Sequence, residues 1–416
     1  MISKMNAATL TKQERLNLKA NINKTLLLGF CGVFLVIMPI LVPFFEERGL
    51  DMQDVFLLQA IFAAVVLLME IPSGYLADVL GRRSTLVVGA LFLGIGHSLL
   101  LIADDFFSLM LFEIGLGIGV SLVSGSDLAL LYDTEIALGR SVETQRKVVG
   151  RLYTAHTVAE ALASVVCSVL LLYWTYDTAV YVQVAVGWMP FLVSLTLHEP
   201  PGERLGSEGH LQNFSMILRR LLLGENILRY VFLSLCIWSL TTFYAVWLLQ
   251  RLWLDQGLHV QNFGYLWGIL MLSAAIAGRC AHMVEDRIGT VALLVIVGLL
   301  PVFGYIGLAS FSAAGGFVAA LMFFVARGFG LVVLREALNR RIESRYRATA
   351  NSLASFGFRG SFVISGPLVG YVLNLWGLQS TLWMLACASL IIFVVLILPL
   401  IFSVEVENVN GSVSSG

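Results

Sequence analysis

The sequence contains few charged residues and gathers none of its basic residues into a tract. Asp, Glu, Lys and Arg make up 13% of the 416 residues, whereas 58% of the residues are hydrophobic. A soluble protein carries about 25% charged residues, so this composition excludes an ordinary soluble chain. The net charge is −1 and the lysines and arginines are scattered, which argues against a nucleic acid as a partner.

Patterns typical of catalytic or metal sites are also missing. The sequence has no His-Glu-x-x-His and no phosphate-binding loop, and Ser124-Gly125-Ser126-Asp127 lacks the context of a nucleophile elbow. The five cysteines lie in or beside apolar runs without metal-ligand spacing, so we interpret them as core residues. We therefore expect no enzyme, no metal and no cofactor.

Long apolar runs are the dominant feature of the sequence. Runs of about 18 to 25 residues recur, each long enough to cross the ~30 Å hydrocarbon layer of a bilayer. They predict an all-α membrane protein with twelve transmembrane helices in two six-helix bundles. The expected spans are 25–45, 55–75, 84–103, 106–131, 148–173, 178–197, 230–252, 262–284, 291–310, 316–338, 348–375 and 381–402.

The basic residues orient these helices. Cytoplasmic loops of membrane proteins are enriched in lysine and arginine. With both termini inside, all but four of the 26 basic residues fall in cytoplasmic segments, the exceptions being Arg48, Arg251, Arg327 and Arg359. One helix more or fewer would spoil this alternation. We expect a multi-pass protein of the cell (inner) membrane with both termini in the cytoplasm.

A polar, turn-rich segment beginning at His198 divides the chain, and an amphipathic stretch over 211–223 follows it, expected on the inner membrane surface. The expected organisation is a cytoplasmic N-terminal segment 1–24, a six-helix bundle 25–197, a cytoplasmic linker 198–229, a second bundle 230–402 and a disordered cytoplasmic tail 403–416. Two such halves suggest internal repeats with the substrate path between them.

The most specific stretch is Gly74-Tyr75-Leu76-Ala77-Asp78-Val79-Leu80-Gly81-Arg82-Arg83, a charged turn between two apolar runs. Two consecutive arginines are costly in hydrocarbon, so the turn must lie at a water face, which the basic-residue rule makes the cytoplasm. The glycines permit a tight turn and a close approach of another helix. After the eighth expected helix, Gly278-Arg279-Cys280-Ala281 and Glu285-Asp286-Arg287-Ile288-Gly289 repeat this stretch in degraded form.

The stretch resembles, position for position, the signature of the major facilitator superfamily between transmembrane helices two and three. In that family an acidic residue at the cytoplasmic end of helix four pairs with the arginine and aspartate of the signature and holds the cytoplasmic gate closed. The resemblance implies that Asp133, Asp78 and Arg82 form this cluster, with Gly74, Gly81 and Arg83 completing the motif. The alternative is that Asp133 is an acid solvated at the interface.

Ionisable residues inside apolar helices are the candidates for proton coupling or substrate binding, because each costs at least about 2.5 kcal/mol in the membrane. They are Glu70, Glu113, Asp127, His156, Glu160, Arg327 and Arg359. On one continuous helix, Glu113 and Asp127 return to within about 40° of the same face, whereas Asp133 points to the other side.

Three pairings follow from position. Many family members, notably the drug antiporters, carry an arginine where Glu113 stands, and the closer match to their arginine-glycine pattern is Arg327 in the second half; the two residues are candidates for a charge pair or for substrate and proton ligands. Glu70 and Arg359 lie at similar depths, which permits a bridge. His156 and the glutamate four residues later suit a proton relay, half a metal site or an ordinary interhelical hydrogen bond.

We expect a secondary active transporter that moves a small organic molecule by alternating access, with the proton gradient as its energy source. Aromatic residues and buried carboxylates suit amphipathic or cationic molecules, so proton-coupled, multidrug-like efflux is the leading interpretation. The glycine-rich motif that antiporters often carry in helix five is replaced here by Glu160-Ala161-Leu162-Ala163-Ser164. The alternatives are a proton-linked importer or facilitator of a metabolite, and a non-transporting membrane receptor or scaffold. The expected partners are the substrate, protons and the lipid bilayer, and the protein is expected to be a monomer.

Overall fold

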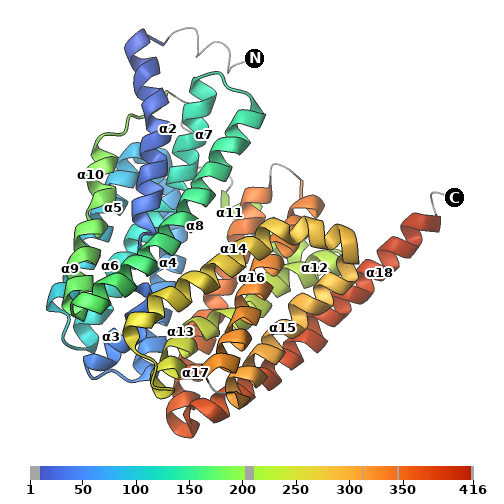
Figure 1. Ribbon diagram of the computed structural model, residues 1–416. Coiled ribbons are helices and arrows are strands. Elements are labelled where there is room, and N and C mark those ends of the chain that lie inside the picture. The colour runs from blue at the N-terminus through green and yellow to red at the C-terminus, as the bar shows by residue number, and fades with distance from the viewer. Residues whose placement is uncertain (1–9, 202–209, 312, 344–345, 414–416) are drawn as a thin grey trace. The chain divides into compact units, whose positions relative to one another are not determined.

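A computed structural model describes residues 10–201, 210–311, 313–343 and 346–413 (Figure 1). Within these residues the chain is helical and forms no strand. The helices are α2 (Lys12–Gly32), α3 (Leu41–Glu47), α4 (Met52–Leu80), α5 (Arg82–Leu99), α6 (Phe106–Val123), α7 (Ser126–Ala137), α8 (Val142–Tyr173), α9 (Tyr176–Gly187), α10 (Met189–Leu195), α11 (His210–Leu223), α12 (Asn226–Leu233), α13 (Ser239–Asp255), α14 (Phe263–Ile288), α15 (Thr290–Ser310), α16 (Ala313–Arg341), α17 (Arg347–Ile392) and α18 (Leu398–Val413). Short 3-10 helices lie at Met38–Ile40, Leu100–Ile102 and Val260–Asn262, and π-helical turns lie at Ser234–Trp238 and Phe393–Ile397.

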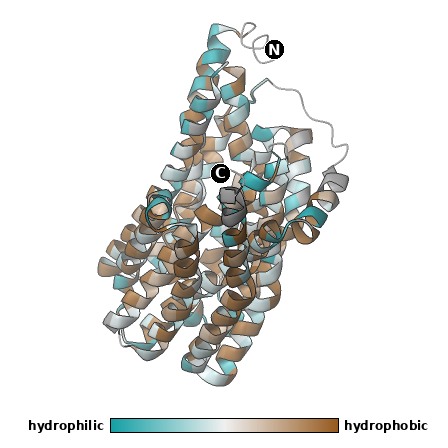
Figure 2. Cartoon of the chain, turned by 90° about the vertical axis from the view of Figure 1, so that its right-hand side faces the viewer, coloured by the Kyte–Doolittle hydropathy of each residue, from teal (hydrophilic) through white to brown (hydrophobic). Residues whose placement is uncertain are grey.

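Ten helical stretches among the described residues are long and apolar enough to cross a membrane. The last stretch, Thr349–Glu407, covers two of the expected spans. Gly377, with φ 75° and ψ 170°, interrupts α17 between them. Figure 2 shows hydrophobic residues along most of the length of the helices. Large apolar side chains are exposed, such as Leu68 at 73% and Ile364 at 72%, as expected of residues that face lipid. The all-α membrane fold is confirmed.

The first expected span, 25–45, is divided in the structure. A capping box between Thr11 and Glu14 starts α2 at Lys12, inside the segment predicted as a polar N-terminal extension. The helix ends at Gly32, and a 3-10 turn containing Pro39 precedes α3. Proline has no backbone N–H to donate, so a continuous helix across this position would lose a hydrogen bond.

The C-terminal segment also differs from the expectation. The sequence predicts disorder from residue 403 onward, but residues 403–413 continue α18, and the last three residues of the predicted tail lie outside the described part. Val404 packs against the hydrophobic core of the second half, and Glu407 forms an ion pair with Arg341 of α16. These two contacts stabilise a helix that its polar composition does not predict.

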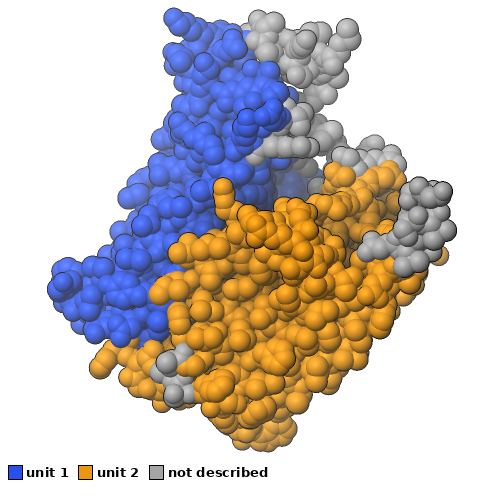
Figure 3. All heavy atoms as spheres, turned by 45° about the vertical axis from the view of Figure 1, so that its right-hand side comes forward, with its two compact units in different colours: residues 1–50, 61–208, 260–268 blue, residues 51–60, 209–259, 269–416 orange. Residues whose placement is uncertain are grey.

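The chain forms two compact units, shown in different colours in Figure 3. Unit 1 comprises residues 1–50, 61–208 and 260–268, and unit 2 comprises residues 51–60, 209–259 and 269–416. Helix α4 therefore begins in unit 2 and ends in unit 1, whereas α14 begins in unit 1 and ends in unit 2. The bundle boundaries expected from the sequence do not include this exchange of helix starts.

The repeat that the sequence suggests has a backbone counterpart. Gly81 precedes α5 with φ 94° and ψ 157°, and Gly289 precedes α15 with φ 83° and ψ 155°. Both conformations lie in the left-handed region, which favours glycine. The same turn thus opens the third helix of each half.

Candidate functional site

The signature stretch is mostly helical, and only Gly81 makes the turn. Helix α4 continues to Leu80, so the expectation that Gly74 lies in a turn is wrong. Gly74 is exposed, a Cβ placed on it would have no atom within 4 Å, and its role in close helix packing stays a prediction. Gly81, by contrast, has a positive φ, and a Cβ there would lie 2.7 Å from Glu199 Oε1. Glycine is required at this position for two independent reasons.

Glu199 holds the start of α5. Its carboxylate accepts hydrogen bonds from the backbone N–H groups of Arg82 at 2.8 Å and Arg83 at 2.7 Å. The first N–H groups of a helix have no partner within the helix, and negative charge is favourable there. The Arg83 guanidinium in turn donates to the carbonyl of Leu195 at the end of α10, at 3.1 Å. Sequence reasoning missed Glu199 because it placed the residue in the linker, although it is an acid directly after the sixth expected helix.

Helix α2 fixes the segment that carries Glu199. The Asn21 side chain donates to the His198 carbonyl at 2.7 Å and accepts from the His198 N–H at 3.0 Å. Lys24 donates to the Thr196 carbonyl at 2.6 Å. Asn21 is completely buried, so its two hydrogen bonds are shielded from water. We call Asn21, Lys24, Arg82, Arg83 and Glu199 the unit 1 clamp.

The arginine of the signature also approaches α7. Arg82 Nε lies 3.6 Å from Asp133 Oδ2, with side-chain exposures of 25% and 40%. An ion pair this exposed contributes about 0.2–1 kcal/mol, so it orients the arginine more than it stabilises the fold. The side chain of Asp78 lies outside the described residues. The pair implied by the family resemblance is thus present, and its role as a gate stays a prediction.

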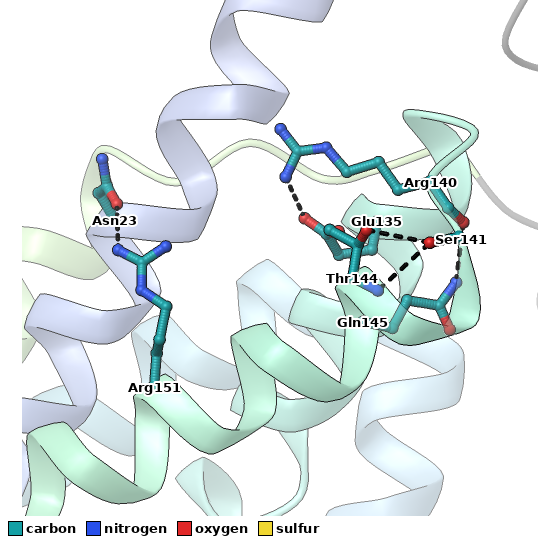
Figure 4. Close-up of polar contacts among 7 residues, drawn as sticks. All are labelled: Asn23, Glu135, Arg140, Ser141, Thr144, Gln145 and Arg151. Atoms are coloured by element: carbon teal, nitrogen blue, oxygen red, sulfur yellow. Dashed lines mark hydrogen bonds and ion pairs between the residues drawn. The ribbon is translucent and has the colours of Figure 1, made fainter.

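A second acid, Glu135, is buried near the end of α7 (Figure 4). Its Oε1 accepts from Arg140 at 2.8 Å, whereas its Oε2 is buried without a hydrogen-bond partner in the described part of the chain. Ser141 caps α8 and Gln145 donates to the Arg140 carbonyl at 3.4 Å, which fixes the turn between the two helices. Sequence reasoning missed Glu135 because it lies beyond the end predicted for helix four.

Unit 2 carries a related set of charges. Arg340 pairs with Glu336 on α16, and His282 Nε2 lies 3.3 Å from the other oxygen of Glu336. Glu336, Arg340 and the pair between Arg341 and Glu407 border a cavity of about 210 Å³. Glu336 and Arg341 of α16 are five residues apart, as are Glu135 of α7 and Arg140.

The fourth expected helix, 106–131, is broken. Helix α6 ends at Val123 and α7 begins at Ser126, with Gly125 between them at φ 86° and ψ −38°. The prediction that Glu113 and Asp127 share one helical stripe is therefore wrong, because it assumed a continuous helix. Both acids are buried, with 2% and 7% exposure, and Asp127 accepts a hydrogen bond from the N–H of the next residue at the start of α7.

Glu113 lies on a helix that packs closely against two others. A Cβ on Gly117 would lie 2.8 Å from Val65 of α4, and one on Gly119 would lie 2.9 Å from the Gly89 carbonyl of α5. Small residues of this kind let membrane helices approach each other. The glycine-rich run after Glu113 therefore explains why this acid is almost completely buried among helices of unit 1.

The remaining acids and the histidine of unit 1 have different surroundings. Glu70 on α4 is half-buried, and Glu160 on α8 is exposed. His156, one turn before Glu160, is half-buried and packs against Gly29 of α2, where a Cβ would lie 2.7 Å from its Nε2. No group of three or more His, Cys, Asp and Glu among the described residues could hold a metal ion. The relay remains a prediction.

The candidate arginines belong to unit 2. Arg327 lies on α16, with its Cζ 5.9 Å from the ring centroid of Phe243 on α13. The glycines that follow position it: a Cβ on Gly328 would collide with the Ala274 carbonyl of α14, and one on Gly330 with the ring of Trp238. The predicted pairs of Glu113 with Arg327 and of Glu70 with Arg359 would join the two units and stay predictions.

In unit 2, the start of α4 is held on α17. The Asn374 side chain donates to Asp51 Oδ2 at 2.6 Å and to Gln53 Oε1 at 3.4 Å. A Cβ on Gly370 would lie 2.8 Å from the Cα of Gln53. This close contact of backbones requires glycine on α17.

In unit 1, the start of α14 is held on α8 in the same manner. The N–H of Tyr265 donates to Ser168 Oγ at 3.0 Å, and a Cβ on Gly264 would collide with the Ser164 carbonyl. Each unit therefore binds the first residues of a helix that ends in the other unit. No local pattern predicts these contacts, since they join residues about 100 to 320 positions apart.

Replacing Gly81 by alanine is expected to lower the thermal stability of the protein. A side chain in the left-handed region costs about 1–2 kcal/mol, and this one would also displace the Glu199 carboxylate. Gly74→Ala is the matched control, because alanine in an exposed helix interior is favoured by about 0.5–1 kcal/mol. Melting of the purified variants in detergent should show Gly81→Ala below and Gly74→Ala at or above the parent. Equal melting temperatures would contradict the turn assignment.

Three comparisons bear on identity. A family profile of the Major Facilitator Superfamily matches residues 25–339. Curated proteins give no match. Similar solved structures include a mutant of the nucleoside transporter NupG (TM-score 0.76, 14% identity, covering 92% of this chain and 100% of that one) and a bacterial homologue of the human lysosomal transporter Spinster (TM-score 0.71, 15% identity, covering 95% and 98%). A POT family transporter in complex with 5-aminolevulinic acid is also similar, with TM-score 0.70, 12% identity and coverage of 92% and 96%.

These identities are low enough that the structures show only a shared fold. The profile, however, covers three quarters of the chain and includes the signature stretch, whose Gly81 makes the turn before α5 and whose two arginines begin that helix. Together with the helical architecture, this match establishes that the chain belongs to the Major Facilitator Superfamily.

Proposed function

We propose that the protein is a secondary active transporter of a small organic molecule, with transport coupled to protons and no cofactor other than the proton gradient. The observation that carries this proposal is Glu113, an acid with 2% exposure on an apolar helix of a transporter fold. A charged group at such a site is costly and is seldom retained for packing. A carboxyl group that gains a proton facing one side and releases it facing the other would couple the two fluxes.

The candidate acids and the candidate arginines inside apolar helices lie in different units. The candidate acids Glu70, Glu113 and Asp127 lie in unit 1, whereas Arg327 and Arg359 lie in unit 2. We infer that the acids carry protons and that the arginines bind cargo. The unit 1 clamp and the pair of Arg82 with Asp133, to which the family resemblance adds Asp78, would stabilise one end state of alternating access, and its release would favour the other.

Efflux and uptake both fit this mechanism. Multidrug-like efflux is the leading interpretation of the sequence. A proton-linked importer or facilitator of a metabolite is the second candidate, and it is supported by similar structures of a nucleoside transporter and of a POT family transporter in complex with 5-aminolevulinic acid. We further propose a monomer in the cell (inner) membrane with both termini in the cytoplasm.

Reconstitution into liposomes tests the proposal. A panel of nucleosides, amino acids, organic acids and cationic dyes would be offered with an imposed pH gradient of either sign. We expect at least one compound to accumulate, and collapse of the gradient by a protonophore to abolish that accumulation. If no compound moves with either gradient, a non-transporting receptor or scaffold becomes the better account. Accumulation that a protonophore leaves unchanged would refute proton coupling.

A further inference from the structure

An aromatic cluster in unit 2 lies beside Arg327, whose Cζ is 5.9 Å from the ring centroid of Phe243. Phe243 of α13 meets Phe358 of α17 at a centroid distance of 5.3 Å and Phe362 at 4.9 Å, both edge-to-face. Trp247, one turn along α13, meets Phe243 at 6.2 Å. Helix α13 contacts both α16 and α17, so three helices of one unit contribute to this cluster (Figure 1).

The cluster is held in place by contacts outside it. Tyr244 donates a hydrogen bond to Ser365 at 2.5 Å, which fixes α13 to α17. Tyr305 of α15 donates to the Thr241 carbonyl at 2.6 Å. A site whose side chains are fixed before binding loses less freedom when a ligand arrives.

The cluster contains a buried donor without a partner. Trp247 is 3% exposed, and its indole N–H has no hydrogen-bond partner in the described residues. An unpaired buried donor is unfavourable, and a ligand oxygen would satisfy it. Beside it, Phe243 and Phe358 are only half-buried, so part of the aromatic surface remains accessible.

We propose that Arg327, Phe243 and Phe358, with Phe362 and Trp247 packed against Phe243, form a binding site for an organic anion that carries a planar or aromatic group. A guanidinium binds a carboxylate through two parallel hydrogen bonds. Aromatic rings arranged edge-to-face accept a further ring in the same geometry. This assignment rests on the proposed transport function and makes its cargo an organic anion, whereas the sequence favoured amphipathic or cationic molecules.

The chemistry of the surroundings favours an anion over a cation. No Asp or Glu occurs in α13 before Asp255, none occurs in α15, and α16 has none before Glu336. Helix α17 has no Asp or Glu, so Arg327 of α16 and Arg359 of α17 are the charges carried by the middle of these four helices of unit 2. A cationic cargo would meet the like charge of Arg327 and no carboxylate from these segments.

Direct binding to the purified full-length protein in nanodiscs tests the site separately from transport. The probes are benzoate, cyclohexanecarboxylate and benzylammonium, and the readout is tryptophan fluorescence. Benzoate is expected to bind saturably, cyclohexanecarboxylate about three- to tenfold more weakly, and benzylammonium not at all. Arg327→Gln should weaken benzoate at least about tenfold. Arg335→Gln, two turns further along α16 and exposed, is the control and should bind as the parent does.

Two further variants keep the test decisive if Arg327→Gln is unstable. Arg327→Lys keeps the charge but loses the paired hydrogen bonds, so benzoate should bind with intermediate affinity. Phe243→Leu should remove the preference for benzoate over cyclohexanecarboxylate. Binding of benzylammonium equal to that of benzoate, or unchanged affinity in Arg327→Gln, would overturn the site even if the liposomes transport. Binding as expected without any transport would instead overturn the proposed function.

Discussion

Glu113→Gln is expected to reduce proton-driven transport to the level of liposomes without protein. Glutamine keeps the size of the side chain and its capacity for hydrogen bonds, but it cannot gain or release a proton at physiological pH. Glu113 has 2% exposure and lies on an apolar helix, so water does not reach this position and cannot transfer the proton in its place. Accumulation of a transported compound under an imposed pH gradient, measured with parent and variant, checks this.

A second assay separates loss of coupling from loss of folding. Exchange of labelled for unlabelled cargo across the liposome membrane needs no net proton movement, so Glu113→Gln should retain it. Asp177→Asn, which changes an exposed acid at the start of α9, is the matched control and should behave as the parent does. Gradient-driven accumulation by Glu113→Gln at the parent rate would show that another group carries the proton.

Gly328→Ala is expected to destabilise the protein strongly. The added methyl group would collide with the backbone carbonyl of Ala274 and crowd the side chain of Ala277, both on α14. Backbone atoms of a packed helix cannot move independently, so α14 and α16 would have to separate. Overpacking costs about 1–3 kcal/mol, which predicts a melting temperature lower by roughly 5 °C or more.

Gly360→Ala on α17 is the control for this variant. No atom lies within 4 Å of a Cβ at that position, and alanine is a better helix former than glycine by about 0.5–1 kcal/mol. Its melting temperature should equal or exceed that of the parent. Melting of both purified variants in detergent, followed by the monodisperse fraction after heating, provides the measurement. A Gly328→Ala protein as stable as the parent would refute the close contact of α14 with α16, and with it our explanation of how Arg327 is positioned.

The class of fold and the signature turn could be predicted from the sequence because both depend on local pattern. Long apolar runs predict membrane-spanning helices directly, and Gly81 with the two arginines that follow it predicts a turn at the water face. The degraded repeat at Gly289 proved to be the same turn with nearly the same dihedral angles. Features that depend on residues close together in the sequence could therefore be predicted.

Features that depend on partners distant in the sequence, or on one residue that interrupts a helix, could not be predicted. Glu199 lies 117 positions from Arg82, and no local pattern links them. Gly125 interrupts an apolar run that hydropathy alone predicts as one helix. The prediction that Glu113 and Asp127 share one face of that helix was therefore wrong. The segment after residue 403 has a disordered composition, and its contacts to α16 and to the core of unit 2 come from tertiary packing.

In the proposed mechanism, movement of cargo and movement of protons are one process. Liposomes containing the protein and a trapped pH indicator would be given a gradient of a transported compound and no initial pH gradient. We predict that the internal pH changes, that the change saturates with the compound, and that Glu113→Gln abolishes it. Movement of the compound with no change of internal pH would contradict this mechanism.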